Sequence, residues 1–94
     1  MEVKQKQTAG KGCFFIEENE KEMAVMTYTV QNEMQFSIDH TVVDPSQGGK
    51  GLGKLLFLEA VKFAREHHYK IVPLCAYAAS VFQKSDEYND VLAN

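Results

Sequence analysis

The sequence predicts an α+β fold, in which an antiparallel β-meander precedes a β-α-β unit and a short helix ends the chain. Two observations predict this class. Alternating apolar and β-branched runs fill the chain before residue 44, and a strong amphipathic helical pattern follows a glycine-rich break. With 94 residues, of which 45% are apolar and 24% charged, the chain can build one modest core. We therefore expect residues 1–94 to form a single domain, with residues 1–12 as a loose polar lead-in.

Three strands are expected in the first half of the chain, over residues 13–18, 23–30 and 34–43. Their β-branched and aromatic residues favour strands, and Asn19-Glu20 between the first two suits a tight hairpin turn. In the third run, alternation places four side chains on one face: Met34, Phe36, Ile38 and His40. The three strands are thus expected to form an antiparallel meander.

A helix over about residues 51–67 follows the glycines, because its apolar residues fall on about half of the helix circumference. The short apolar run of residues 69–75 then predicts one further buried strand. A strand, a helix and a strand in this order form a parallel, right-handed crossover. Pro73 has no N–H to donate, so we expect the new strand to pair over only part of its length. Residues 77–84 are predicted to form the short C-terminal helix.

Charge and cysteine content narrow the range of partners. Ten Lys and Arg against 13 Asp and Glu give a formal net charge of −3, which does not favour nucleic acid as the main partner. No stretch is apolar enough for a membrane span, and the N-terminal residues lack the apolar core of a secretory signal. We therefore expect a cytoplasmic protein with free thiols at Cys13 and Cys75 and no membrane partner. Cys13, His40 and Cys75 lack the spacing of a metal site, so no metal is expected.

The glycine-rich segment Gly49-Lys50-Gly51-Leu52-Gly53 lies between a predicted strand and a predicted helix. A helix N-terminus carries unpaired N–H groups and a partial positive charge, and glycines let a diphosphate approach the backbone. Lys50 adds a cation at the same place. The segment fits neither a Walker loop, which would need Ser or Thr at residue 55, nor the dinucleotide fingerprint, which would need glycine at residue 54. A flexible turn that only starts the helix remains the alternative.

Residues 46–51, Ser-Gln-Gly-Gly-Lys-Gly, resemble the pyrophosphate-binding signature of the GCN5-related N-acetyltransferases, Arg/Gln-x-x-Gly-x-Gly/Ala. Gly49 and Gly51 match its two diagnostic glycines. Ser46 stands where the family has Arg or Gln, and Gln47 lies one step out of register. The likeness is closer to the short, stand-alone branch of the family. The landmarks of this branch cover most of residues 36–88: His40-Thr41-x-Val43 with Pro45, the glycine loop, Pro73-Leu74-Cys75 and Glu87-Tyr88.

This resemblance implies a mixed sheet whose two parallel strands splay apart, with acetyl-CoA in the splay. The pyrophosphate would lie on the glycine loop, and the pantetheine arm would mimic a strand within the splay. The residues implied to bind acetyl-CoA are Val42, Val43, Gln47, Gly48, Gly49, Lys50, Gly51, Leu52, Gly53 and Lys54. The family also has two helices between its first two strands, for which this chain has no room. The acceptor side is therefore expected to be open or completed by a partner chain.

The resemblance also implies transfer of the acetyl group to an amine, either a small molecule or a protein lysine. Many members place a tyrosine after the last parallel strand, where this chain has Val81-Phe82. Cys75 is the candidate catalytic thiol, which would take the acetyl group by thioester exchange, and His40 is the candidate base. The alternatives are a CoA-binding module without transfer and an interaction domain without a ligand. Cys75 would then be a core thiol and His40 a sheet histidine.

Overall fold

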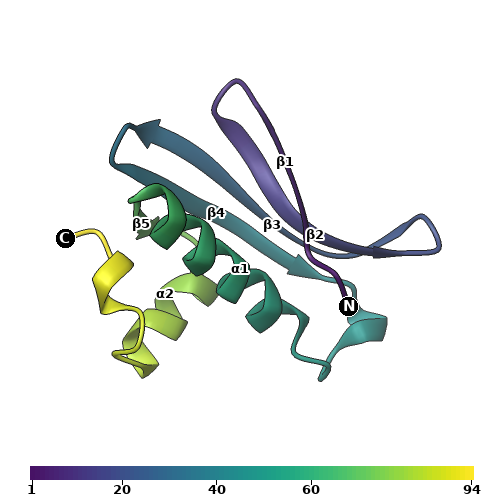
Figure 1. Cartoon of the computed structure of the whole chain (residues 1–94). Helices are drawn as coiled ribbons and strands as arrows, with labels where there is room; N and C mark the ends of the chain where they lie inside the picture. Colours follow the sequence, from purple (N-terminus) through teal and green to yellow (C-terminus); the bar gives the residue numbers. More distant parts are fainter.

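A computed structural model of the chain describes all 94 residues and shows one five-stranded sheet with both α-helices on the same face (Figure 1). The strands are β1 (Lys4–Thr8), β2 (Lys11–Glu18), β3 (Lys21–Asn32), β4 (Gln35–Val43) and β5 (Lys70–Pro73). The helices are α1 (Leu52–His67) and α2 (Ala76–Lys84), with two short 3-10 helices, η1 (Pro45–Gln47) and η2 (Asn89–Val91). The strands lie side by side in chain order, and only β4 and β5 are parallel. The other face of the sheet carries no helix.

The predicted α+β class, the meander and the parallel crossover are confirmed. Each predicted helix boundary lies within one residue of the observed one, whereas β5 is shorter than the apolar run that predicted it. No helix is long and apolar enough to cross a membrane.

The prediction of a loose lead-in is wrong, because Lys4–Thr8 form the edge strand β1. All its side chains are exposed, so it has no apolar pattern that would reveal a strand. Tyr28 anchors it: its hydroxyl accepts a hydrogen bond from Gln5 Nε2 and donates one to Gln7 Oε1, each at 2.8 Å. The ring reaches β1 by passing Gly12, where a Cβ would lie 2.7 Å from the ring. Backbone pairing with β2 and this polar tether, not apolar burial, therefore hold the strand.

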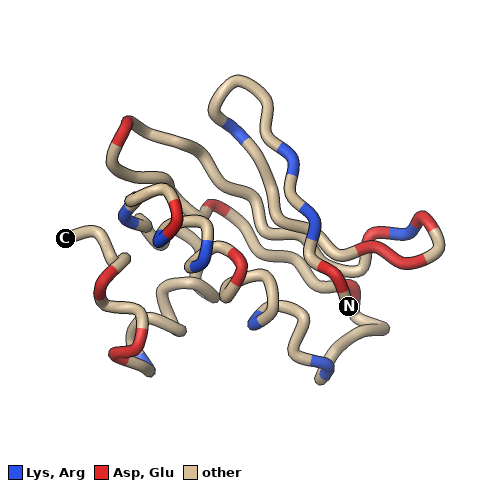
Figure 2. Tube along the Cα trace, viewed as in Figure 1, with Lys and Arg blue, Asp and Glu red and all other residues tan.

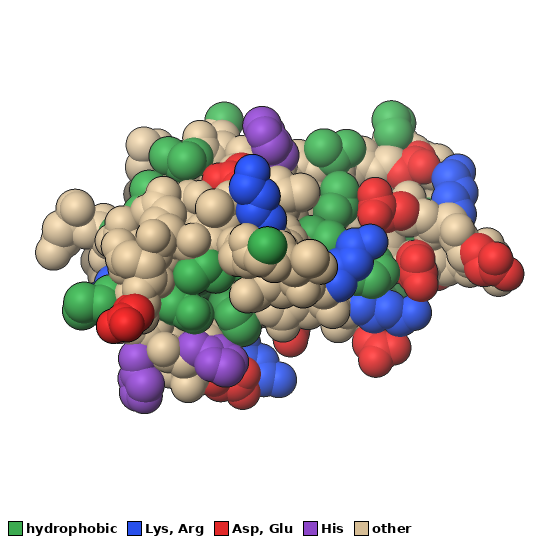
Figure 3. All heavy atoms as spheres, turned by 90° about the horizontal axis from the view of Figure 1, so that it is seen from above, with side chains coloured by type: hydrophobic (Ala, Val, Ile, Leu, Met, Phe, Trp, Pro, Cys, Tyr) green, Lys and Arg blue, Asp and Glu red, His purple; other side chains and the backbone are tan.

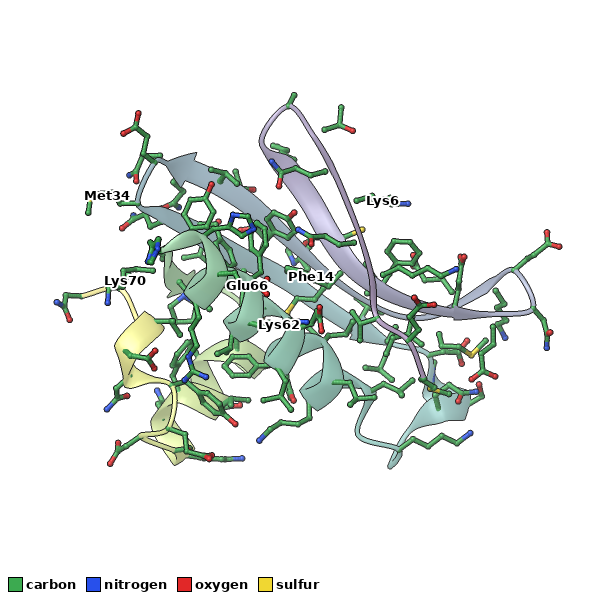
Figure 4. The ribbon with its side chains drawn as sticks, viewed as in Figure 1. Lys6, Phe14, Met34, Lys62, Glu66 and Lys70 are labelled. Atoms are coloured by element: carbon green, nitrogen blue, oxygen red, sulfur yellow. The ribbon has the colours of Figure 1, made fainter.

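The core lies between the sheet and α1. Phe14, Tyr28, Phe36 and Phe63 pack there with ring centroids 5.0 to 5.7 Å apart. In Figure 4, Phe14 lies between the sheet and the helix, whereas Met34 lies at the tip of the β3–β4 hairpin. A second aromatic cluster holds α2 and the C-terminal segment on α1: Phe57, Phe82 and Tyr88. The apolar face of α1 packs on the sheet and on this second cluster. The N-terminal end of the helix faces the loop that precedes it.

A β-bulge in β4 reverses the faces of its C-terminal half. Tyr28 pairs with Ile38 and Thr27 pairs with His40, so Asp39 is one residue too many for β3. His40 therefore lies on the face away from the helices and is exposed. The prediction that His40 shares a face with Ile38 is wrong, because simple alternation holds only while the register is unbroken.

The two parallel strands separate after one short stretch of pairing, which ends at Ile38 opposite Pro73. The carbonyl of Ile38 accepts hydrogen bonds from both Leu74 N, at 3.0 Å, and Cys75 N, at 3.1 Å. Beyond this point β4 continues alone to Val43, while the chain turns from β5 into α2. The partial pairing predicted from Pro73 is thus confirmed, and it leaves an opening beside β4.

Candidate functional site

The link between β4 and α1 begins with a capped turn. The Asp44 carboxylate accepts hydrogen bonds from Ser46 Oγ, at 2.7 Å, and from Ser46 N, at 2.9 Å, and so caps η1. These bonds, together with the Lys21 ammonium 3.3 Å away, lower the pKa of Asp44. This capped turn fixes the direction in which the backbone enters the glycine loop at Gly48.

The glycine loop leaves a row of backbone donors without partners. Gly49 and Gly51 have φ angles of 82° and 73°, in the left-handed region. Gly51 is the N-cap of α1 and has no side chain to satisfy the first N–H groups. No intramolecular hydrogen bond uses the N–H groups of Gly49, Gly51, Leu52, Gly53 or Lys54. Alternating backbone conformations with such free donors form a concave site for an anion, and the dipole of α1 favours one further.

The loop is also open and cationic. A Cβ built on Gly49 or Gly51 would meet no atom within 4 Å, so internal packing does not require glycine at either place. Between residues 45 and 58 the only charged side chains are Lys50 and Lys54, as Figure 2 shows for the N-terminal end of α1. Lys50 Nζ donates to Gln47 Oε1 at 3.0 Å, and Lys54 Nζ lies 5.6 Å from the ring centroid of Tyr88.

A groove of about 310 Å³ runs from this loop along β4 toward α2. Its lining includes most of the residues predicted to bind the cofactor: Val43, Gln47, Gly48, Gly49, Gly51, Leu52, Gly53 and Lys54. Two predicted residues are not in it. Val42 is 60% exposed on the opposite face of the sheet, because of the bulge, and the Lys50 side chain turns back to Gln47.

Thr41 and Tyr77 line the groove and were missed by the sequence predictions. Thr41 faces it only because of the bulge, which no alternation pattern reveals. Tyr77 lies on the first turn of α2, and a Cβ on Gly53 would be 3.2 Å from its ring. Burial raises the pKa of Tyr77, so its hydroxyl stays protonated, and it makes no intramolecular hydrogen bond. The hydroxyl is therefore a free donor on the wall of the groove.

Cys75 lies where the strands separate, on the helix side of the sheet. It is the N-cap of α2, and its Sγ accepts a hydrogen bond from Ala78 N at 3.4 Å. The same Sγ lies 3.4 Å from Thr41 Oγ1. His40 lies on the other face, opposite Thr27, and makes no hydrogen bond to Cys75. The structure therefore brings the thiol to Thr41 and not to His40.

Comparison with known proteins identifies the family of the chain. Residues 13–91 match the family described as GCN5-related N-acetyl-transferase. The chain belongs to this family. Members of the GCN5-related family use acetyl-CoA as co-substrate and an acceptor as second substrate, so membership supports acetyl transfer from acetyl-CoA as the activity. The glycine loop, with its free N–H groups and open surface, fits the diphosphate of that co-substrate.

Solved structures of the family resemble the chain closely in fold. A GCN5-like protein from Staphylococcus aureus, solved by NMR, is 35% identical; the match covers 99% of this chain and 88% of that one, with a TM-score of 0.75. A ribosomal-protein alanine N-acetyltransferase from Escherichia coli is 18% identical, with a TM-score of 0.68 over 83% of this chain. This chain spans 53% of the length of that enzyme. A Trypanosoma brucei acetyltransferase is 23% identical, with a TM-score of 0.62 over 81% of this chain and 61% of that one. No curated protein matches the sequence.

Proposed function

We propose that the chain binds acetyl-CoA in the groove of Thr41, the glycine loop and Tyr77, and that it passes the acetyl group to an amine by way of Cys75. The pyrophosphate lies on the free N–H groups of Gly49, Gly51, Leu52, Gly53 and Lys54. The pantetheine arm follows the unpaired edge of β4 toward the point where the strands separate. The observation that carries this proposal is the continuity of the groove from these donors to Thr41, which lies 3.4 Å from the Cys75 thiol.

The transfer through Cys75 proceeds in two balanced steps. The Cys75 thiolate attacks the thioester carbon, a new C–S bond forms, and the bond to the CoA sulfur breaks; CoA leaves as a thiol and takes up one proton. The acceptor amine then attacks the cysteine thioester, an amide forms and Cys75 is released. Ala78 N, at the N-terminus of α2, already donates a hydrogen bond to this sulfur at 3.4 Å and holds it at the point where the strands separate.

His40 acts on the other side of β4 in this proposal. It is exposed on the face away from the helices, one residue before Thr41, and lies next to the same separation of the strands. From there it takes the proton from the incoming amine and not from the thiol. Two further cofactor contacts, at Val42 and Lys50, are proposed through the backbone only. The side chain of Val42 lies on the same face as His40, and that of Lys50 turns back to Gln47, so both point out of the groove.

Mass spectrometry after mixing the protein with acetyl-CoA tests the covalent step. We expect a gain of one acetyl group on the intact chain, which Cys75→Ser abolishes and Cys13→Ser keeps. Cys13 is the matched control because it is the other free thiol and is buried in the sheet. CoA binding with no acetyl gain in any variant would contradict the cysteine step and favour the CoA-binding module.

A further inference from the structure

A second groove lies on the face of the sheet away from the helices, and the proposed function leaves it without a role. It has a volume of about 630 Å³ and runs across β2, β3 and β4 to the residue after β5. Its lining is mostly polar: Lys11, Gly12, Thr27, Tyr28, Thr29, Asp39, His40 and Leu74. In the view from above, charged and apolar side chains are interspersed over the surface (Figure 3). The groove meets the donor side at the separation of the strands, because Leu74 precedes Cys75 and His40 precedes Thr41.

Asp39 is a half-buried carboxylate in this groove with no cation beside it. It is the extra residue of the β4 bulge, a device that turns a side chain out of the ladder beside functional sites. Thr29 Oγ1 and Ser37 Oγ each donate to one of its oxygens at 2.7 Å. The ion pairs of the chain are Lys4–Glu17, Lys21–Asp44 and Arg65–Asp90, and none includes Asp39.

Two hydroxyl bonds leave half of the acceptor capacity of this carboxylate unused, since an ionised carboxylate has about four lone-pair sites. Partly buried charges are normally paired, and Ser37, which supports Asp39, is itself only 2% exposed. Lys11, the lysine in the lining of the groove, forms no ion pair with it. The sheet thus orients a half-buried carboxylate that no cation of the chain pairs with.

We propose that this groove is the acceptor site and that Asp39 holds the ammonium group of a primary alkylamine there. This inference rests on the proposed function, because it takes the donor thioester to lie at the strand separation. Leu74, which is 63% exposed, offers an apolar surface for the alkyl chain. His40, beside Asp39, removes the proton before the amine attacks. Both a small amine and a protein lysine carry this chemistry, and the open groove admits either.

The test is a titration of the CoA-saturated, 15N-labelled protein with n-butylammonium chloride at constant ionic strength. We expect the amide signals of Thr29, Asp39, His40 and Leu74 to shift. Asp39→Asn and the shorter Asp39→Ser should weaken binding about fivefold or more, because charge-assisted hydrogen bonds are worth more than neutral ones. Glu33→Gln is the matched control: it also removes one carboxylate, but from the exposed β3–β4 turn. n-Butanol has a similar chain and no charge, so its affinity for Asp39→Asn and for the unaltered protein should be the same.

Equal affinity for n-butylammonium in the Asp39 variants and in Glu33→Gln would overturn the proposal, as would shifts confined to other parts of the chain. CoA-induced shifts at residues 48–54 report the donor site separately, so a failure of the proposed function is recognised on its own. A short blocked peptide with one lysine, titrated in the same way, identifies the source of the amine. Tighter binding than n-butylammonium assigns a protein lysine, and equal or weaker binding assigns a small amine.

Discussion

Two of the turns with left-handed backbone, one between β2 and β3 and one before α1, differ in what surrounds them. In the turn between β2 and β3, Asn19 and Glu20 have φ angles of 52° and 66°. In the loop before α1, Gly49 and Gly51 have φ angles of 82° and 73°. The hairpin turn thus meets the conformational demand without any glycine, as Asn in particular can.

The comparison separates two reasons for a glycine. A positive φ alone does not require glycine in this chain, since Asn19 and Glu20 adopt it. Internal crowding does not require it at Gly49 or Gly51 either, because a Cβ there would meet nothing within 4 Å. Left-handed backbone favours glycine in the loop, and the open space there also leaves room for a group from outside the chain, next to backbone donors that no internal acceptor uses.

Gly12 is a glycine of a third kind, crowded by the chain itself, and its substitution gives the largest expected effect on stability. A Cβ on Gly12 would lie 2.5 Å from the Lys6 carbonyl oxygen and 2.7 Å from the Tyr28 ring. Gly12→Ala should therefore destabilise the fold by about 2 kcal/mol, as overpacking does. Gly48→Ala, whose Cβ would stand 3.4 Å from the Pro45 carbonyl oxygen, should change stability far less. Urea denaturation of both variants measures the difference, and equal midpoints would contradict it.

Substitution in the glycine loop should affect binding and not folding. Gly51→Asn keeps a residue that tolerates left-handed backbone but fills the open space above the loop. We expect CoA affinity to fall about tenfold or more, a loss of about 1.4 kcal/mol, with little change in the urea midpoint. Gly10→Asn is the matched control, because Gly10 has a φ angle of 81° in the β1–β2 turn. Equal CoA affinities of the two variants in calorimetry would contradict binding of the diphosphate at the glycine loop.

The smallest expected effect, a gain in the free energy of unfolding, comes from a substitution in the turn between β2 and β3. Glu20→Gly replaces a strained residue and creates Asn-Gly, the preferred pair for this turn. Relief of the left-handed strain, about 1 to 2 kcal/mol, is partly offset by the greater chain entropy of glycine, about 0.5 to 1 kcal/mol. The net expectation is a gain of about 0.5 kcal/mol in the free energy of unfolding, with CoA affinity unchanged. A lower urea midpoint would show that Glu20 is not strained.

Most of the fold follows from patterns that the sequence displays. The amphipathic stripe of α1 and the partial pairing at Pro73 are local signals, and the structure confirms both. Strand β1 is hidden, because its Lys and Gln side chains are all exposed and its tether is the hydroxyl of Tyr28. Such long-range polar contacts leave no periodic trace in a sequence.

The residues of the site also fall into two groups, those that a sequence motif reveals and those that tertiary structure places. The glycine loop is visible as a motif, so most of its predicted residues line the groove. The placement of Thr41, Asp39 and His40 depends on one bulge, which exchanges the faces of β4 and which alternation does not predict. Tyr77 reaches the groove only through the packing of α2 beside the first turn of α1, near Gly53. One unpaired residue thus decides which side chains face the donor and which face the opposite groove.

A titration of 15N-labelled protein with CoA shows whether the glycine loop binds the diphosphate. We expect the amide signals of Gly49, Gly51, Leu52, Gly53 and Lys54 to move first and farthest, while those of Asn19 and Glu20 stay in place. Saturation at millimolar CoA or below is expected. No shift in the glycine loop at that concentration, or shifts only at other residues, would contradict this binding.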